Sequence, residues 1–433
     1  MKQKLNILFY ADVLCYGLEP NAYRSGVFFV ALNILKCLAE KDFIKITFDT
    51  SYSNFDKLRK FLEIYFPDKC FNIVDLNCSD SYISKLYLDL KNAKSRAKKE
   101  KKNVKKFFYQ VLLWCIYLIH GVDYICACMR YSKLYDAYFT PAYNMSKTVR
   151  KCTGIKKFVF LHDFIPFILP DLHPDSGKDS WFNKMVRGLS PDWYYFTNSE
   201  CTRNDCLKYC PQIDKNKIFT ALLACDEHFK PADDKMQQYV KNKYNIPMDK
   251  KYVFSLCTLE PRKNLIRAVK TFVEFIKKDN IDDMVFVLGG GHWDMFIDKL
   301  NSEIEDLGDY KDKIIKAGYI EDEDLPALYS GAHWVVYTSV YEGFGLPPLE
   351  AMASGCPVIT SNNSSLPEVV GDAGLTVNPY SDEEHIMAYE KYYYDSNLRQ
   401  ENKIKGLERA KLFSWQKCTD IIVNQMFNAV SKE

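Results

Sequence analysis

The feature that most constrains the fold is an apolar run that leads through a glycine-bearing turn into a short helix. Residues 334–337 read as a buried strand, and residues 341–353, YEGFGLPPLEAMA, follow shortly after it. Gly343 and Gly345 allow a tight turn, and Pro347 suits the first turn of a helix, where its missing N–H costs nothing. A strand that feeds a helix in this way is typical of an open α/β sheet, whose ligands bind at the carboxyl ends of the strands.

The same alternation of strand and helix recurs along the chain. Residues 5–10 and 44–48 have the composition of buried strands, and residues 27–39 between them carry apolar side chains at helical spacing. The second half restarts with a strand-like run at 252–256 and a helical pattern over 261–276. Strands that alternate with helices favour parallel sheets. At 433 residues the chain is long enough for two such domains.

The composition excludes several classes of function. The chain has 58 Lys and Arg against 56 Asp and Glu, a formal net charge of +2, whereas a nucleic-acid-binding protein usually has a strongly basic face. Fifteen cysteines occur without a CxxC pair, so we expect reduced thiols in the cytoplasm and no zinc site. The first ten residues read as a strand rather than a signal peptide, and no apolar run reaches the roughly 20 residues that cross a bilayer.

Two adjacent cations suggest an anion site in the second half. Pro261 is expected to open a helix with Arg262 and Lys263 in its first turn. Cations at a helix start oppose the macrodipole, and a bound anion would resolve that conflict. Arg can hold a pyrophosphate through two parallel hydrogen bonds and Lys as a point charge. The alternative is that both are solvated surface cations.

Two carboxylates bracket the glycine turn. Glu350 lies near the start of the helix, where the macrodipole alone favours an acid, but Glu342 precedes the helix, where that explanation weakens. By themselves the two acids leave a ligand contact and a structural role open. A further acidic run, residues 321–324, reads as the start of another helix, and no metal site is expected.

Three motifs together resemble those of a known family. The patterns E-G-F-G-L-P-P-L-E-A-M-A-x-G-x-P-V-I, T-L-E-P-R-K-N-L and P-E-V-V-G-D-A-G are similar to those of the retaining nucleotide-sugar glycosyltransferases of family 4. The resemblance implies the GT-B fold, in which two Rossmann-like α/β domains face each other across a cleft. The expected limits are 1–231 for the acceptor domain, 232–411 for the donor domain and 412–433 for a last helix that returns to the first domain.

The resemblance also carries over to single residues. His162 ends a buried strand within an H-D pair whose histidine faces the donor sugar in the family. Where the family often has a second glycine and a basic residue after the position of Gly26, this chain has Phe28 and Phe29. The catalytic positions implied are His162, Arg262, Lys263 and Glu342. The donor-binding positions implied are Gly26, Gly289, Gly290, Tyr319, Ile320, Gly343, Phe344, Gly345, Leu346 and Glu350.

The implied reaction is transfer of a sugar from a nucleoside diphosphate sugar, GDP-mannose or a UDP- or dTDP-hexose, to a glycan or lipid-linked acceptor in surface polysaccharide or glycoconjugate synthesis. It proceeds with retention and needs no metal or cofactor. The form T-L-E-P-R-K-N is similar to that of mannosyl- and rhamnosyltransferases. Two alternatives stay open: a non-catalytic sugar-binding or scaffold subunit of this fold, and a nucleotide-sugar epimerase or phosphorylase.

Residues 91–119 fit two different structures. Residues 91–106 contain nine basic residues and one acid, and residues 107–119 are apolar except for Gln110. Such a segment can pack as a buried helix behind a solvated lysine run, or lie in the surface of an anionic membrane. The second structure would place the enzyme on the cytoplasmic face of the membrane, beside a lipid-linked acceptor.

Overall fold

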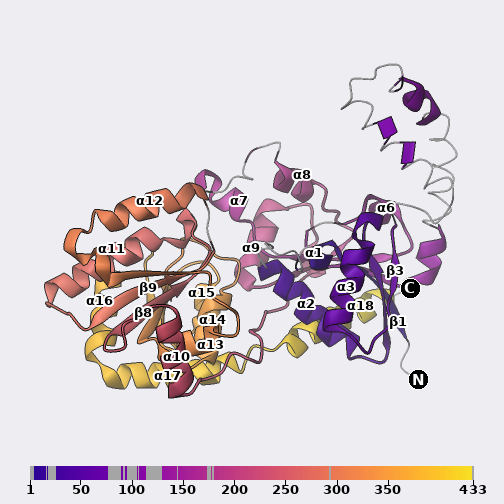
Figure 1. Ribbon diagram of the computed structural model, residues 1–433. Coiled ribbons are helices and arrows are strands. Elements are labelled where there is room, and N and C mark those ends of the chain that lie inside the picture. The colour runs from indigo at the N-terminus through magenta and orange to yellow at the C-terminus, as the bar shows by residue number, and fades with distance from the viewer. Residues whose placement is uncertain are drawn as a thin grey trace.

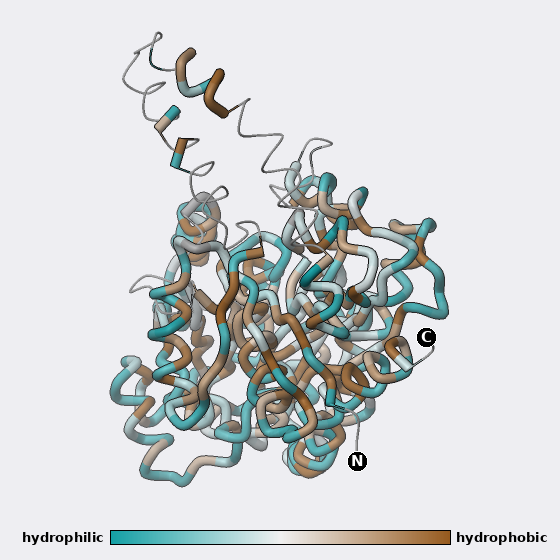
Figure 2. Tube along the Cα trace, turned by 90° about the vertical axis from the view of Figure 1, so that its right-hand side faces the viewer, coloured by the Kyte–Doolittle hydropathy of each residue, from teal (hydrophilic) through white to brown (hydrophobic). Residues whose placement is uncertain are grey.

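The computed structural model contains two parallel β-sheets, each covered by helices on both faces (Figure 1). It describes residues 4–15, 17, 26–76, 89–90, 93–94, 105, 107–113, 129–143, 145–172, 177, 180–291 and 294–431. Hydrophobic residues line the strands and the inner faces of the helices, while hydrophilic residues predominate on the outside (Figure 2). The predicted α/β fold with parallel sheets is confirmed.

The N-terminal sheet has seven strands in the order β3-β2-β1-β4-β5-β6-β7, and every neighbouring pair is parallel. Its centre is a cluster of phenylalanine rings that are fully buried, among them Phe9, Phe139 and Phe158. The strands are β1 (Leu5–Tyr10), β2 (Ile44–Asp49), β3 (Asn72–Val74), β4 (Ala137–Thr140), β5 (Lys156–Leu161), β6 (Tyr194–Thr197) and β7 (Ile218–Thr220). The helices are α1 (Asp12–Cys15), α2 (Gly26–Ala39), α3 (Phe55–Tyr65), α6 (Lys147–Lys151), α7 (Ile165–Ile168), α8 (Trp181–Arg187) and α9 (Glu200–Tyr209).

The C-terminal sheet has six parallel strands in the order β10-β9-β8-β11-β12-β13. They are β8 (Lys251–Leu256), β9 (Met284–Gly289), β10 (Ile314–Gly318), β11 (Trp334–Tyr337), β12 (Val358–Ser361) and β13 (Leu375–Val377). The helices are α10 (Asp234–Lys243), α11 (Leu265–Lys278), α12 (Asp294–Glu305), α13 (Leu325–Gly331), α14 (Leu346–Ala353), α15 (Leu366–Val370), α16 (Asp382–Tyr394) and α17 (Ser396–Ala410). In both sheets the strand order reverses beside the first strand, which is the switch point where ligands bind in open α/β sheets.

The last helix, α18 (Trp415–Val430), crosses from the C-terminal sheet to the N-terminal one (Figure 1). It packs against α2, Phe427 contacts the ring of Phe43, and Asp420 pairs with Lys41 at 2.7 Å. These contacts tie the chain's last helix to its first domain. The exact domain limits at 231 and 411 remain a prediction.

The segment 91–119 lies largely outside the described residues. The helical residues 107–113 stand apart from both sheets (Figure 2). Phe107, Phe108 and Val111 are exposed there, whereas Leu113 is buried. The choice between a buried helix and a membrane-surface contact for 91–119 stays a prediction, because most of that segment lies outside the described residues. In the part of the chain that the structure describes, no helix is long and apolar enough to cross a bilayer.

Candidate functional site

The glycine turn and its helix form as expected at the carboxyl end of β11. Helix α14 begins at Leu346, one residue earlier than predicted, and Gly345 caps it with a φ of 143° that favours glycine. Pro347 and Pro348 follow within the first turn and have no N–H. The free donors at this helix end therefore reduce to the N–H groups of Gly345 and Leu346.

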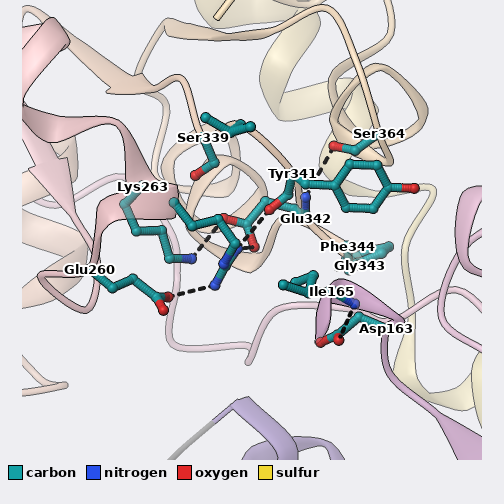
Figure 3. A network of polar contacts seen from close by, with 12 residues as sticks. Asp163, Ile165, Glu260, Lys263, Ser339, Tyr341, Glu342, Gly343, Phe344 and Ser364 are labelled. Atoms are coloured by element: carbon teal, nitrogen blue, oxygen red, sulfur yellow. Dashed lines mark hydrogen bonds and ion pairs between the residues drawn. The ribbon is translucent and has the colours of Figure 1, made fainter. Parts of the chain in front are cut away.

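Glu342 lies at the centre of an ion-pair network (Figure 3). Its Oε1 is 2.7 Å from Nζ of Lys263, and its Oε2 is 2.7 Å from Nη1 of Arg262. The side chain is buried, which alone would raise the pKa of Glu342, but the two cations outweigh burial and lower its pKa to about 2. Glu342 is therefore ionised near neutral pH.

The two cations have further partners that fix their direction. Arg262 also donates to Glu260 at 2.6 Å and to the carbonyl oxygen of Tyr341 at 2.7 Å. Lys263 donates to the hydroxyl of Tyr337 at 2.6 Å. Among the described residues the buried Nε of Arg262 has no hydrogen-bond partner. Both cations point inward toward the glycine turn, so the alternative of solvated surface cations is wrong.

The expected position of this pair at a helix start needs a correction. Arg262 and Lys263 lie in a separate 3-10 turn, and α11 begins only at Leu265. Asn264, between the 3-10 turn and α11, has a left-handed φ of 60°. Its side-chain amide donates to the carbonyl oxygens of Thr338 and Pro379. The helix macrodipole therefore does not explain why cations occur here, whereas the buried acids Glu342 and Glu260 do.

His162 lies directly after β5 and is buried. Its Nε2 is 2.7 Å from the carbonyl oxygen of Pro141 and donates to it, which leaves Nδ1 as an acceptor. Burial lowers the pKa of His162 to about 4, so the ring is neutral near pH 7. The hydroxyl of Tyr143 accepts from the backbone N–H of His162 at 3.0 Å and fixes the peptide.

The two domains meet where the glycine turn reaches His162. A Cβ added at Gly343 would lie 2.2 Å from the carbonyl oxygen of His162, so only glycine fits there. Gly26, at the start of α2, faces the side chain of Leu346 across the same junction, 3.9 Å from the place of its Cβ. Five expected site residues from three distant segments thus lie around one junction: Gly26, His162, Glu342, Gly343 and Leu346.

Glu350 lies inside α14, away from the ion pairs. Its carboxylate is partly buried and accepts from the hydroxyl of Tyr329 at 3.1 Å. Burial raises the pKa of Glu350 to about 7, because the hydrogen bond from Tyr329 only partly compensates the lost hydration. The side chain therefore titrates near neutral pH.

The remaining donor-side positions have structural partners of their own. Phe344 packs edge-on against Phe413 in the core. Gly290 approaches the backbone of Cys257 so closely that a Cβ would lie 1.8 Å from its carbonyl oxygen, and Gly289 ends β9 beside it. Ile320 is 3% exposed, whereas Tyr319 is 64% exposed. Ligand contacts by Phe344 and Ile320 would thus involve their backbone, while the side chain of Tyr319 is accessible.

Sequence reasoning missed two groups of the site. Glu260 lies within T-L-E-P-R-K-N-L, two residues before Arg262, and this spacing is the signal by which the ion pair could have been predicted. Tyr337 is the last residue of β11, and nothing in its surroundings marked it as a partner of Lys263. Within the described residues, no group of three or more His, Cys, Asp or Glu is arranged to hold a metal ion.

The two facing sheets, the glycine turn at their junction and the returning last helix define a GT-B protein of two Rossmann-like domains. The structure of Anabaena Alr3699/HepE in complex with UDP and glucose superposes with a TM-score of 0.67 over 98% of this chain and 99% of that one, at 13% identity. The likeness at this identity concerns the fold alone.

Sequence comparison identifies the family. Residues 236–409 match the model of the family "Glycosyl transferases group 1". The O-antigen chain mannosyltransferase B of Escherichia coli is 33% identical over 264 residues, which cover 61% of this chain and 68% of that protein. The serotype-specific mannosyltransferase WbdA of Escherichia coli is 28% identical over 258 residues, 59% of this chain but only 31% of that protein. The chain belongs to the group 1 glycosyltransferases, and the predicted resemblance to family 4 is confirmed.

Proposed function

We propose that the protein is a retaining hexosyltransferase of surface polysaccharide synthesis. It moves a sugar from a nucleoside diphosphate sugar to a glycan or lipid-linked acceptor, and mannose is the first candidate for that sugar. The observation that carries the proposal is the buried cation pair Arg262 and Lys263, which faces a glycine turn at the switch point of the sheet. The choice of mannose is supported by relatives that are named O-antigen mannosyltransferases.

The chemistry requires positive charge at the leaving group. When the bond from the sugar to phosphate breaks, negative charge develops on the diphosphate, and fixed donors stabilise it best. Glu342 and Glu260 together balance the two positive charges of Arg262 and Lys263. A bound diphosphate competes for both cations and for the N–H groups of Gly345 and Leu346, which releases the Glu342 carboxylate to accept hydrogen bonds from sugar hydroxyls.

The other side chains bind and orient the donor. The free Nδ1 of His162 accepts a hydrogen bond from a hydroxyl of the donor sugar, since Nε2 already donates to Pro141. Glu350 holds the ribose hydroxyls, and the exposed ring of Tyr319 covers the base. Retention follows if the leaving phosphate itself takes the proton of the acceptor hydroxyl. These roles agree with the family resemblance, and no metal or cofactor takes part in any of them.

A donor panel tests the function. The purified protein is incubated with GDP-mannose, UDP-glucose, UDP-galactose, ADP-glucose and dTDP-rhamnose, with and without glycan and lipid-linked acceptors, and released nucleotide and the anomeric configuration of the product are measured. We expect acceptor-dependent release of GDP and an α-linked product from GDP-mannose. Isomerised nucleotide sugar would indicate an epimerase, and phosphate-dependent cleavage of a glycan would indicate a phosphorylase. Binding without any turnover would indicate a scaffold subunit.

We also propose that the enzyme works in the cytoplasm as a peripheral protein of the membrane, which it contacts through residues 91–119. The basic run in the sequence and the exposure of Phe107, Phe108 and Val111 support this contact. Flotation with liposomes of anionic and of zwitterionic lipid at low salt is the test. Binding to anionic liposomes alone, abolished in the triple variant F107S/F108S/V111S, is the expected result. Absence of flotation with either lipid would contradict the contact.

A further inference from the structure

The first turn of α9 and its cap form hydrogen bonds with the C-terminal domain at the candidate site. Ser199 caps the helix by accepting from the N–H of Thr202 at 3.0 Å. The Ser199 hydroxyl also lies 2.7 Å from the carbonyl oxygen of Gly343, and the Thr202 hydroxyl lies 3.1 Å from the same oxygen. Both side chains are completely buried. Two hydroxyls of the N-terminal domain therefore donate to one carbonyl oxygen of the glycine turn.

Two side chains of the C-terminal domain reach back to the same helix. The carboxylate of Glu368, on α15, accepts from the backbone N–H groups of Glu200 and Cys201 at 2.8 and 2.7 Å. It satisfies donors that a helix start leaves without intrahelical partners. The hydroxyl of Tyr341 donates to Asp205 at 2.7 Å. Side chains of α9 and its cap thus bond to the C-terminal domain, and side chains of the C-terminal domain bond to α9.

The same turn of α9 also holds His162. The side-chain amide of Asn198 donates to the carbonyl oxygen of His162 at 2.8 Å. That oxygen is the atom against which Gly343 packs. Asn198, Ser199 and Thr202 therefore fix the peptide of His162 and the peptide of Gly343 side by side, although the two residues belong to different domains.

We propose that residues 198–202 form a closure clamp, in which Ser199 and Thr202 position the glycine turn against His162 when the two domains come together. Interfaces between domains of one chain are commonly mobile, and closure completes the catalytic groups in many enzymes. The groups that hold the diphosphate, Arg262 and Lys263, lie wholly on the C-terminal side. Loss of the clamp should therefore lower turnover and leave nucleotide binding intact.

The test is the double variant S199A/T202V, in which the hydroxyls are removed with little change of volume. The inference rests on the proposed function for its turnover readout only. We expect turnover to fall at least about tenfold, because small displacements of reacting groups are costly. The Kd for GDP or UDP, whichever the parent binds more tightly, should stay within twofold in calorimetry. The radius of gyration from small-angle scattering should increase.

The matched control is S180A. Ser180 caps α8 in the same domain by accepting from the N–H of Asn183 at 3.1 Å. It tests the loss of a cap without an interdomain bond and should leave turnover, Kd and radius of gyration unchanged. E368Q is a second variant with a milder change. It should lower turnover and increase the radius of gyration, as the double variant does, with the nucleotide Kd unchanged. It replaces the double variant if that variant does not fold.

Turnover within twofold of the parent overturns the clamp, and so does a nucleotide Kd that weakens as much as turnover. If the parent protein transfers no sugar at all, the proposed function fails but scattering still decides on the clamp. A larger radius of gyration in the folded double variant would then support it, and an unchanged radius would overturn it.

Discussion

The two halves of the molecule share one architecture but stabilise buried charge differently at their sheet edges. In the C-terminal half, Arg262 and Lys263 are held against Glu342 and Glu260. Five nitrogen–oxygen contacts of 2.6 to 2.7 Å surround the two cations, including one to the hydroxyl of Tyr337 and one to the carbonyl oxygen of Tyr341. Paired cations of this kind can exchange an internal carboxylate for the phosphates of a ligand. This half therefore offers the cations that the proposed diphosphate would bind.

In the N-terminal half, the buried Asp49 and the partly buried Asp12 accept hydrogen bonds from neutral groups. Asp49, the last residue of β2, accepts from the hydroxyl of Tyr138 at 2.9 Å and from the N–H of Leu76 at 3.2 Å. Asp12 accepts from the hydroxyl of Tyr10 at 2.6 Å. The three family motifs include Arg262, Lys263 and Glu342, whereas Asp12 and Asp49 lie outside all of them. This difference explains why most site residues of the C-terminal half could be predicted from the sequence, whereas few of the N-terminal half could.

The largest expected effect comes from breaking the ion pairs of the C-terminal half. Lys263→Ala and Glu342→Ala should each lower turnover at least about a hundredfold, which corresponds to roughly 2.7 kcal/mol of transition-state stabilisation. Steady-state kinetics with the accepted donor measures this. Lys270→Ala, which removes a half-exposed ion pair between Lys270 on α11 and Glu303 on α12, is the control and should stay within twofold.

Glu342→Ala also leaves Lys263 without its carboxylate partner and Arg262 with Glu260 alone, which destabilises the fold. Thermal unfolding should therefore accompany the kinetics, and Glu342→Gln serves as the variant that keeps the side-chain volume. Near-parental turnover in folded Lys263 and Glu342 variants would show that the cations do not act on a leaving group.

The next effect concerns the partly buried acid of the C-terminal half, Glu350. Since its pKa is about 7 in the folded protein and ordinarily 4.5, the folded state binds more protons than the unfolded chain between these values. The free energy of unfolding therefore falls as the pH rises from about 4.5 to 7. Glu350→Gln lacks this dependence and should be more stable than the parent by about 2 kcal/mol at pH 8, with little difference at pH 4.

Urea unfolding at both pH values measures that difference. Asp49 offers the counterpart in the N-terminal half, because burial raises its pKa to about 7 as well, from 3.8. Asp49→Asn should show a gain of the same sign. Equal stability of parent and Glu350→Gln at pH 8 would mean that the carboxylate is hydrated or paired in solution.

The smallest expected effect is that of His162, which lies on the N-terminal side of the junction. His162→Ala should lower turnover about tenfold, the loss of roughly one hydrogen bond in the transition state, while the nucleotide Kd remains unchanged. Because the pKa of His162 is about 4, the parent and variant should have pH–rate profiles of the same shape from pH 5 to 8. A profile whose acid limb disappears in the variant would contradict a neutral histidine.

The regular elements followed closely from local pattern. The strand Leu5–Tyr10 was predicted with its observed bounds, and the helices at Gly26 and Leu346 begin one residue from the expected start. The helical pattern predicted over 261–276 is also correct from Leu265 onward. The apolar residues at helical spacing there are all buried: Leu265, Ala268, Val269, Phe272, Phe275 and Ile276. The break at Asn264 was not predicted, because it depends on carbonyl oxygens from Thr338 and Pro379, distant in sequence.

By itself the sequence determined two α/β domains, a family motif and a set of charged residues on the donor side, because hydrophobic period and turn chemistry are local properties. Only the tertiary structure decided that Glu342 is shared by Arg262 and Lys263, that His162 is neutral, and that Gly343 rests on the carbonyl of His162 under two hydroxyls of α9. Each of these depends on burial and on contacts between segments about 80 to 180 residues apart in the chain, which no local pattern of side chains encodes.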